Sequence, residues 1–189
     1  MCGGATVWNA LTAYDTRPTE TVGVVGVGGL GHLAIQFAAK FGCRVVVFSG
    51  TDSKKDEAIR LGAHEFVATK GVEEIKVSQK LDRLLVTTSA QPDWKLYMSI
   101  MNPGSVIHPL SVSSGDFSIP YGPLIGQGIT VQGSVVAPRQ IHKDMLKFAA
   151  LHQIKPVIQE FPLSEAGIKD AMDKLEKGEV HFRAVLKPQ

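Results

Sequence analysis

The chain has 189 residues, of which 44% are hydrophobic and 20% charged, and its formal net charge is +2. This composition is typical of a soluble globular protein with one sizeable core, and the length excludes two full domains of about 150 residues. No basic stripe with interleaved aromatic residues is visible, which argues against nucleic-acid binding. The two cysteines, Cys2 and Cys43, are too few for a disulfide framework, so a cytoplasmic location is expected.

One uncharged stretch, Thr21–Ala39, is long enough to cross a bilayer. Its glycines cluster in the middle, and His32 and Gln36 interrupt its second half, a spacing that favours strand, turn and helix over a membrane helix. The first residues do not form a basic segment followed by an apolar core, so no signal peptide is expected.

In chain order, apolar periodicity and turn residues predict alternating helices and strands. The first half is predicted to contain a helix over 5–14, a loop over 15–21, a strand over 22–25, a helix over 30–41 ended by Gly42, a strand over 44–48, a helix capped by Asp52 or Ser53 and ending at Leu61, and a strand over 64–68. The second half is predicted to contain a helix over 72–80, a strand over 81–87, a helix over 94–101 stopped by 102–104, strands over 105–110 and 129–136, helices over 143–152 and 164–178, and a strand over 184–186.

This alternation from 22 to 152 predicts an α/β fold, a Rossmann doubly wound six-stranded parallel sheet with a short C-terminal helix–strand segment. The pattern Gly26-x-Gly28-x-x-Gly31 stands between its first strand and first long helix. Such a turn accepts a pyrophosphate, although the pattern alone is shared with other phosphate-binding loops. The candidate cofactor-binding residues of this turn are Gly26, Gly28, Gly29, Leu30 and Gly31.

The end of the second strand indicates which dinucleotide is bound. Ser49 stands where NAD-binding proteins usually carry an acidic residue, and a small hydroxyl leaves room for a 2′-phosphate. Lys54 supplies charge for that phosphate, which favours NADP, whereas Asp52 would favour NAD if it did not cap the next helix. Lys54 and Lys55 can also be read as a solvated helix start. The candidates here are Ser49, Gly50, Thr51, Ser53 and Lys54.

The glycine motif with His32, the run 53–58 and Leu61-Gly62-Ala63 together resemble the zinc-dependent medium-chain dehydrogenase/reductases, in particular the cinnamyl-alcohol-dehydrogenase-like branch. The resemblance extends from Cys2 to about Leu186. It implies an NADP-binding domain over 3–152 and a segment over 153–189 that would return to a GroES-like catalytic domain not contained in this chain. The implied reaction is hydride transfer between a primary alcohol or aldehyde and NADP, and the fragment alone is expected to be inactive.

The resemblance also assigns individual residues. Cys2 resembles a catalytic-zinc ligand, and because the other ligands have no counterpart here, zinc and all catalytic residues are expected only with the missing domain. Cofactor contacts are implied for Thr88, Ser89, Leu110, Ser111, Ser134, Val135 and Arg183. Pro109-Leu110 departs from the usual Val-Gly, which puts the shape of the nicotinamide pocket in question, and Arg183 reads equally well as a surface charge.

The sequence leaves open the role of His32, the assembly of the protein and two competing functions. His32 either touches the pyrophosphate or packs against the sheet edge. Residues 129–136 are expected to form an edge strand through which two copies pair as a homodimer. A zinc-free quinone or enoyl reductase and a non-catalytic nucleotide-binding module are the competing functions; Cys2 and the Ser-Lys-Lys run argue against the first.

Overall fold

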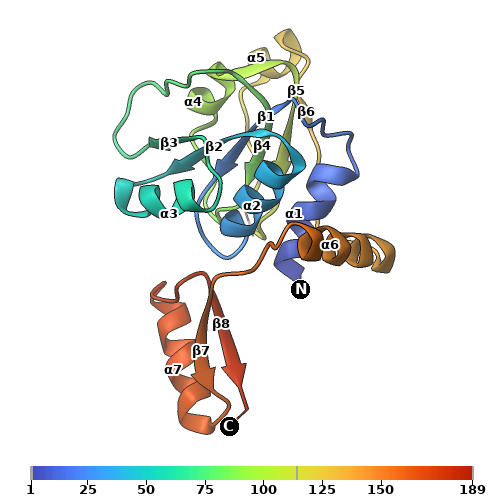
Figure 1. The fold of residues 1–189 in the computed structure, drawn as a ribbon. Helices are drawn as coiled ribbons and strands as arrows, with labels where there is room; N and C mark the ends of the chain where they lie inside the picture. Colours follow the sequence, from blue (N-terminus) through green and yellow to red (C-terminus); the bar gives the residue numbers. More distant parts are fainter. Residues whose placement is uncertain (1, 114, 189) are drawn as a thin grey trace. The chain divides into compact units, whose positions relative to one another are not determined.

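The protein is described by a computed structural model that covers residues 2–113 and 115–188. It divides into two compact units, Met1–Ile154 and Lys155–Gln189, and each is described by itself (Figure 1). The first unit is built on six parallel strands, β1 (Thr21–Val25), β2 (Arg44–Ser49), β3 (Glu65–Ala68), β4 (Leu81–Val86), β5 (Met101–Pro109) and β6 (Thr130–Val131). Their order, β3-β2-β1-β4-β5-β6, confirms the predicted doubly wound fold.

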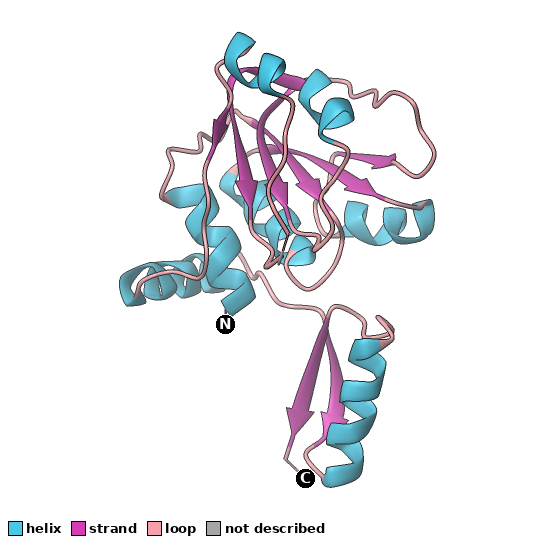
Figure 2. Cartoon of the chain, turned by 180° about the vertical axis from the view of Figure 1, so that it is seen from behind, coloured by secondary structure: helices cyan, strands magenta, loops and turns pink. Residues whose placement is uncertain are grey.

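Helices cover the sheet and connect its strands (Figure 2). They are α1 (Cys2–Thr12), α2 (Gly31–Phe41), α3 (Lys55–Arg60), α4 (Trp94–Ser99), α5 (Tyr121–Gly126) and α6 (Arg139–Leu151). Apolar residues of β2 and β4 belong to one buried cluster with Trp94, Tyr97 and Met98 of α4. Helix α1 lies against both α2 and α6 (Figure 1). All five residues of β1 are buried, as expected for a central parallel strand rich in valine.

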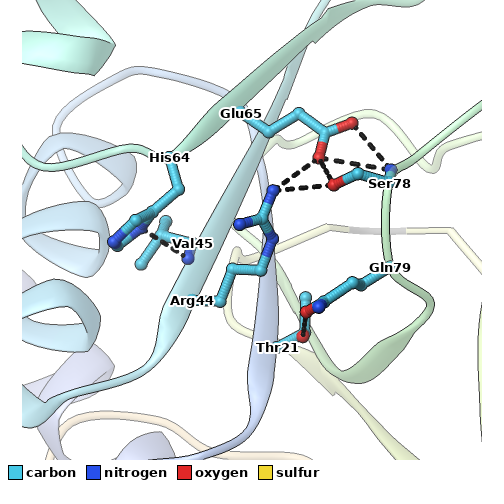
Figure 3. Close-up of polar contacts among 7 residues, drawn as sticks. All are labelled: Thr21, Arg44, Val45, His64, Glu65, Ser78 and Gln79. Atoms are coloured by element: carbon cyan, nitrogen blue, oxygen red, sulfur yellow. Dashed lines mark hydrogen bonds and ion pairs between the residues drawn. The ribbon is translucent and has the colours of Figure 1, made fainter.

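The helix predicted over 72–80 is wrong, because this segment runs without regular structure to β4. A polar network at the start of the strands fixes it instead (Figure 3). The backbone N–H of Ser78 donates to Glu65 at 3.0 Å, the Ser78 hydroxyl donates to the same carboxylate, and Arg44 Nη2 donates to Glu65 at 3.2 Å. These tertiary hydrogen bonds satisfy groups that a helix would otherwise pair, and they override the weak local pattern.

Replacing Glu65 with glutamine is expected to lower the free energy of unfolding by about 1 kcal/mol, because a charge-assisted network loses its acceptor charge. Burial alone would raise the pKa of Glu65, but the hydrogen bonds from Ser78 and the charge of Arg44 hold it below its ordinary value of 4.5. The ionised form is thus stabilised in the folded state, and its contribution is present at neutral pH and lost as pH falls below about 4.5. Urea denaturation should show a larger difference at pH 7 than at pH 3. Glu73→Gln, on the exposed part of the same segment, is the matched control, and equal losses in both variants would contradict the network.

Several boundaries also differ from the prediction; α1, for example, spans Cys2–Thr12 and not 5–14. Strand β5 begins at Met101 and includes residues 102–104, which were expected to be a helix stop. A 3₁₀ turn, η1 (Asp52–Lys54), precedes α3, and neither Asp52 nor Ser53 caps a helix. The edge strand predicted over 129–136 pairs only through Thr130 and Val131. Helix α5, in the Gly/Pro-rich connection before β6, was not predicted.

The second unit is a small βαβ element of β7 (Ile158–Pro162), α7 (Glu165–Glu176) and β8 (Arg183–Lys187). The Ser164 hydroxyl accepts from the Gly167 N–H at 3.2 Å, so the expected N-terminus of this helix is confirmed. Strand β7, which pairs in parallel with β8, was not predicted. Within the described residues, no helix combines the length and the apolar character needed to cross a membrane.

Candidate functional site

A cleft of about 490 Å³ opens at the carboxyl ends of β1, β2 and β4. The sheet order reverses between β1 and β4, and ligands of open α/β sheets bind in the crevice beside such a switch point. The lining includes Gly26 and Gly28 after β1, Ser49 and Gly50 at the end of β2, and Thr88 after β4. We call it the glycine-turn cleft. It brings together predicted residues from three separate parts of the sequence.

The three motif glycines have different physical roles in this turn. Gly26 has a φ of +93°, and an added Cβ would lie 2.5 Å from Thr88 Cγ2. A Cβ on Gly31 would lie 2.0 Å from the Gly26 carbonyl oxygen, so only glycine lets α2 start this close to β1. A Cβ on Gly28 would meet no protein atom within 4 Å. The open space above Gly28 is therefore available to a ligand that approaches the backbone.

Side chains around the turn hold its backbone in place. The ring of His32, fully buried, donates from Nδ1 to the Gly28 carbonyl at 2.9 Å. The Thr87 hydroxyl donates to the carbonyls of Val25 at 2.7 Å and Gly26 at 3.2 Å. Thr87 is a site residue that the sequence reasoning missed. Gly29 and Leu30 complete the turn, half-buried, and Leu30 is the residue before α2.

At the end of β2, Lys54 extends back to the glycine turn. Its Nζ donates to the Val27 carbonyl at 2.8 Å, and both residues line the glycine-turn cleft. The hydroxyls of Thr51 and Ser53 are hydrogen-bonded to one another at 2.9 Å on the exposed rim and do not line the cleft. An ammonium group and the hydroxyl-bearing end of β2 thus stand beside the open turn.

Deeper in the cleft, Thr69 joins β3 to the end of β2. Its backbone N–H and its hydroxyl both donate to the Ser49 carbonyl, at 2.8 and 3.2 Å. Burial raises the pKa of Tyr97, which lines the same wall, to about 12, although a hydrogen bond with Thr69 opposes the shift. Tyr97 is therefore a neutral phenol at physiological pH. Neither Thr69 nor Tyr97 belonged to the predicted set.

A second opening of about 400 Å³, the β5 cavity, lies between the end of β5 and the segment after β6. Its walls contain the predicted residues Leu110 and Ser111 on one side and Ser134 and Val135 on the other. An opening of about 410 Å³, lined by Thr88, Ser89 and Ser111 among others, includes residues of both the cleft and the β5 cavity. The three openings therefore adjoin one another along the carboxyl edge of the sheet, and each is lined by predicted site residues.

His108, which the sequence reasoning also missed, stands one residue before the β5 cavity. Its ring is fully buried, Nδ1 donates to the Gln132 carbonyl at 3.2 Å, and Nε2 has no hydrogen-bond partner among the described residues. Burial and the charge of Arg83 lower the pKa of His108 to about 4, although the Gln132 hydrogen bond opposes the shift. The ring is consequently neutral at physiological pH.

This burial predicts a pH-dependent stability. Between pH 7.5 and pH 5 the unfolded chain takes up a proton at position 108 and the folded chain does not, so the free energy of unfolding falls by about 2 kcal/mol as pH falls. His108→Asn, which keeps a donor near the Nδ1 position, should remove this part of the slope in urea denaturation series. His142→Asn on α6 should leave it. The same slope in wild type and His108→Asn would refute the buried neutral ring.

The comparisons with known proteins agree with this geometry. A family profile described as zinc-binding dehydrogenase matches residues 29–151, which is more than half of the chain. The chain belongs to the zinc-binding dehydrogenase family. The resemblance inferred from the glycine motif and the Ser-Lys-Lys run is thereby confirmed.

Individual relatives extend over almost the whole of this zinc-binding dehydrogenase chain. It is 36% identical over 187 residues to the aldehyde reductase AdhA of Synechocystis, covering 98% of this chain and 55% of the relative. The solved cinnamyl alcohol dehydrogenase SbCAD4 of Sorghum bicolor has 31% identity and a TM-score of 0.89, covering 98% of this chain and 53% of that one. A CAD of Helicobacter pylori, solved with NADP(H), has 25% identity and a TM-score of 0.80, covering 98% and 52%. The chain thus spans about half the length of the relatives it matches.

The metal that gives the family its name does not fit the described residues alone. Cys2 begins α1 and is exposed. Within 2–113 and 115–188, no group of three or more His, Cys, Asp or Glu side chains is placed to hold a metal ion. Zinc sites in proteins use three or four such ligands. A zinc site that uses Cys2 would need further ligands from outside these residues.

Arg183 lies in the second unit, at the start of β8, where it pairs in register with Ile158. Its side chain is half-buried, and its backbone N–H donates to the His181 carbonyl at 2.9 Å. Its contact with a pyrophosphate remains a prediction.

Proposed function

We propose that this chain is the NADP(H)-binding part of a zinc-dependent alcohol or aldehyde oxidoreductase. One observation carries the proposal: the open space over Gly28 at the switch point of the sheet, with the Lys54 ammonium beside it. The N–H groups at the start of α2 favour an anion at this turn, as in other dinucleotide-binding proteins. In this proposal the pyrophosphate lies over Gly28, Gly29 and Leu30.

The end of β2 supports NADP rather than NAD. Ser49 terminates the strand without a negative charge, and Lys54 lies close enough to the turn to bind a 2′-phosphate while remaining on the rim of the cleft. Asp52 is exposed in η1 and does not cap a helix, so its charge is the strongest argument for NAD. The NADP(H) complex of the related Helicobacter pylori enzyme supports the first reading.

The β5 cavity is proposed as the site of the nicotinamide end. A nicotinamide cofactor bound there would exchange a hydride with the substrate, and the chain's own part is to orient the ring between Leu110–Ser111 and Ser134–Val135. The substrate, an alcohol or aldehyde by analogy with the named relatives, and a zinc ion held partly by Cys2 belong to the longer protein in this proposal.

Calorimetric titration of the chain with NADP and with NAD tests the assignment. We expect NADP to bind at least about tenfold more tightly, which corresponds to about 1.4 kcal/mol. Tighter binding of NAD would overturn the assignment of Ser49 and Lys54, and no binding of either would overturn the proposal as a whole.

The chain by itself is proposed to bind the cofactor without turning over an alcohol. An assay with NADP, added zinc and a primary alcohol should yield no NADPH, since the described residues do not assemble a metal site. Steady NADPH production by the isolated chain would show that it is a complete enzyme. The unpaired Cys2 and Cys43 support a proposed cytoplasmic location.

A homodimer through the edge of the sheet is also proposed. Strand β6 is the last strand on its side, and Val131 and Val135 are 37% and 74% exposed. A partner strand would cover this edge. Sedimentation equilibrium should detect a dimer that Val135→Asp weakens, with Val112→Asp, on the loop after β5, as the control. A monomer at high concentration would contradict the dimer.

A further inference from the structure

The segment 132–136 has no regular strand structure after β6, although the Gln132 N–H still donates to the Ile107 carbonyl of β5 at 2.9 Å. It ends at Val136, whose φ of +54° is in the left-handed region that β-branched residues rarely adopt. Such a conformation persists only where the surrounding structure fixes it, and it is often found beside ligand sites. The residues that hold this segment in place therefore indicate its role.

Three of these contacts come from α1 and the turn after it. Asn9 Nδ2 donates to the Ser134 hydroxyl at 2.9 Å, and the Val136 N–H donates to the Thr6 hydroxyl at 3.1 Å. The Tyr14 hydroxyl donates to the Gly133 carbonyl at 3.4 Å. These groups are about 120 to 130 residues distant in the sequence, so no local pattern could have revealed the pairing.

A fourth contact comes from β5, one residue before the β5 cavity begins. His108 donates to the Gln132 carbonyl, and its ring lies 5.4 Å from the ring of Tyr14. The next two residues in the chain, Pro109 and Leu110, line the cavity. The same buried imidazole thus fixes the distance between the end of β5 and the segment 132–136.

None of the four holding residues, Thr6, Asn9, Tyr14 and His108, lines the cavity. Two of the residues they hold, Gly133 and Ser134, line it, and the other two, Gln132 and Val136, stand immediately before and after its lining residues 133–135. We propose that they are positioning residues: α1 and His108 keep the segment 132–136 facing Pro109–Ser111, and so orient the nicotinamide end of a bound dinucleotide. This inference rests on the proposed function, because it assigns the β5 cavity to the nicotinamide. It adds a role for α1, which lies outside the glycine-turn cleft.

The test compares two ligands on the same chain. NADPH carries the nicotinamide, whereas 2′,5′-ADP carries only the adenosine and phosphate end and occupies the glycine-turn cleft alone. The variants are Asn9→Ala and Tyr14→Phe, and the control is Thr12→Ala, whose hydroxyl bonds only within α1 to the Trp8 carbonyl. Dissociation constants are measured by calorimetry, and the fluorescence emission of bound NADPH reports the surroundings of the nicotinamide ring.

We expect Asn9→Ala to weaken NADPH binding about three- to tenfold, the range for one lost hydrogen bond, with a smaller loss in Tyr14→Phe. The emission of bound NADPH should move toward that of the free cofactor in both variants. The dissociation constant of 2′,5′-ADP should stay within about twofold of wild type, which also shows that each variant is folded. Thr12→Ala should match wild type with both ligands.

Unchanged NADPH affinity and emission in both variants would overturn the inference and leave the proposed function intact. A parallel loss for NADPH and 2′,5′-ADP would also overturn it, because the effect would then be structural. If wild type bound no 2′,5′-ADP, the proposed function would fail, and the inference with it.

Discussion

Gly31→Ala is expected to destabilise the first unit by about 2–3 kcal/mol, in the range of substitutions that overpack a core. The new Cβ would lie 2.0 Å from the Gly26 carbonyl oxygen and 3.0 Å from the Thr87 hydroxyl. Because the first of these neighbours is backbone, the start of α2 must move away from β1. The N–H groups that face the cleft move with it, so the affinity for NADP should fall by more than about tenfold.

Gly28→Ala is the matched control, since its Cβ would meet no protein atom within 4 Å. We expect its free energy of unfolding to stay within about 1 kcal/mol of wild type, the usual cost or gain of a glycine-to-alanine change. Its NADP affinity should nevertheless fall, because the methyl group would occupy the space proposed for the pyrophosphate. Denaturant unfolding and calorimetry on both variants separate the two roles. Full NADP affinity in Gly28→Ala would contradict the placement of the pyrophosphate.

Lys54→Ala is expected to weaken NADP binding by about 1.5 kcal/mol or more, roughly tenfold, while the affinity for NAD changes little. Because Lys54 is exposed, its charge-assisted hydrogen bond contributes at the lower end of the usual range. Its ammonium group already donates to the Val27 carbonyl in the turn, so the side chain needs to move little to reach a phosphate there. Competition titrations with both dinucleotides measure the change in preference.

The neighbouring Lys55→Ala serves as the control, because it removes the same charge from the first residue of α3, which is not part of the cleft lining. It should weaken both dinucleotides equally and only slightly, through the overall field. A loss of NADP affinity in Lys55→Ala as large as in Lys54→Ala would mean that general charge, and not a 2′-phosphate contact, decides the preference.

The parts of the fold that sequence predicts well are those determined by adjacent residues. Strand β1, the glycine turn and α2 follow one another within 21 residues, and each is specified by its own apolar run or glycine. The segment 72–80 could not be predicted in this way, because its structure depends on Glu65 and Arg44 from other strands. A loose helical pattern gave no sign of that network.

The same distinction applies to the candidate site. Gly26, Gly28 and Gly31 could be predicted from their spacing, and Ser49 and Lys54 could be predicted from their positions at the end of β2. Thr87 and His108 could not be predicted, because a threonine after a strand or a histidine inside one has no distinctive sequence pattern. Their roles depend on the backbone carbonyls to which they donate. The end of the expected strand at Val131 could not be predicted for the same reason, since the residues after it bond to α1 at the other end of the sequence.

A crystal structure of this chain with NADP would test the central claim most directly. We expect the pyrophosphate over Gly28, the 2′-phosphate within hydrogen-bonding reach of Lys54 Nζ, and the nicotinamide between Leu110 and Ser134. A dinucleotide bound in the reverse direction, with its nicotinamide at the end of β2, or bound outside the carboxyl edge of the sheet, would contradict it.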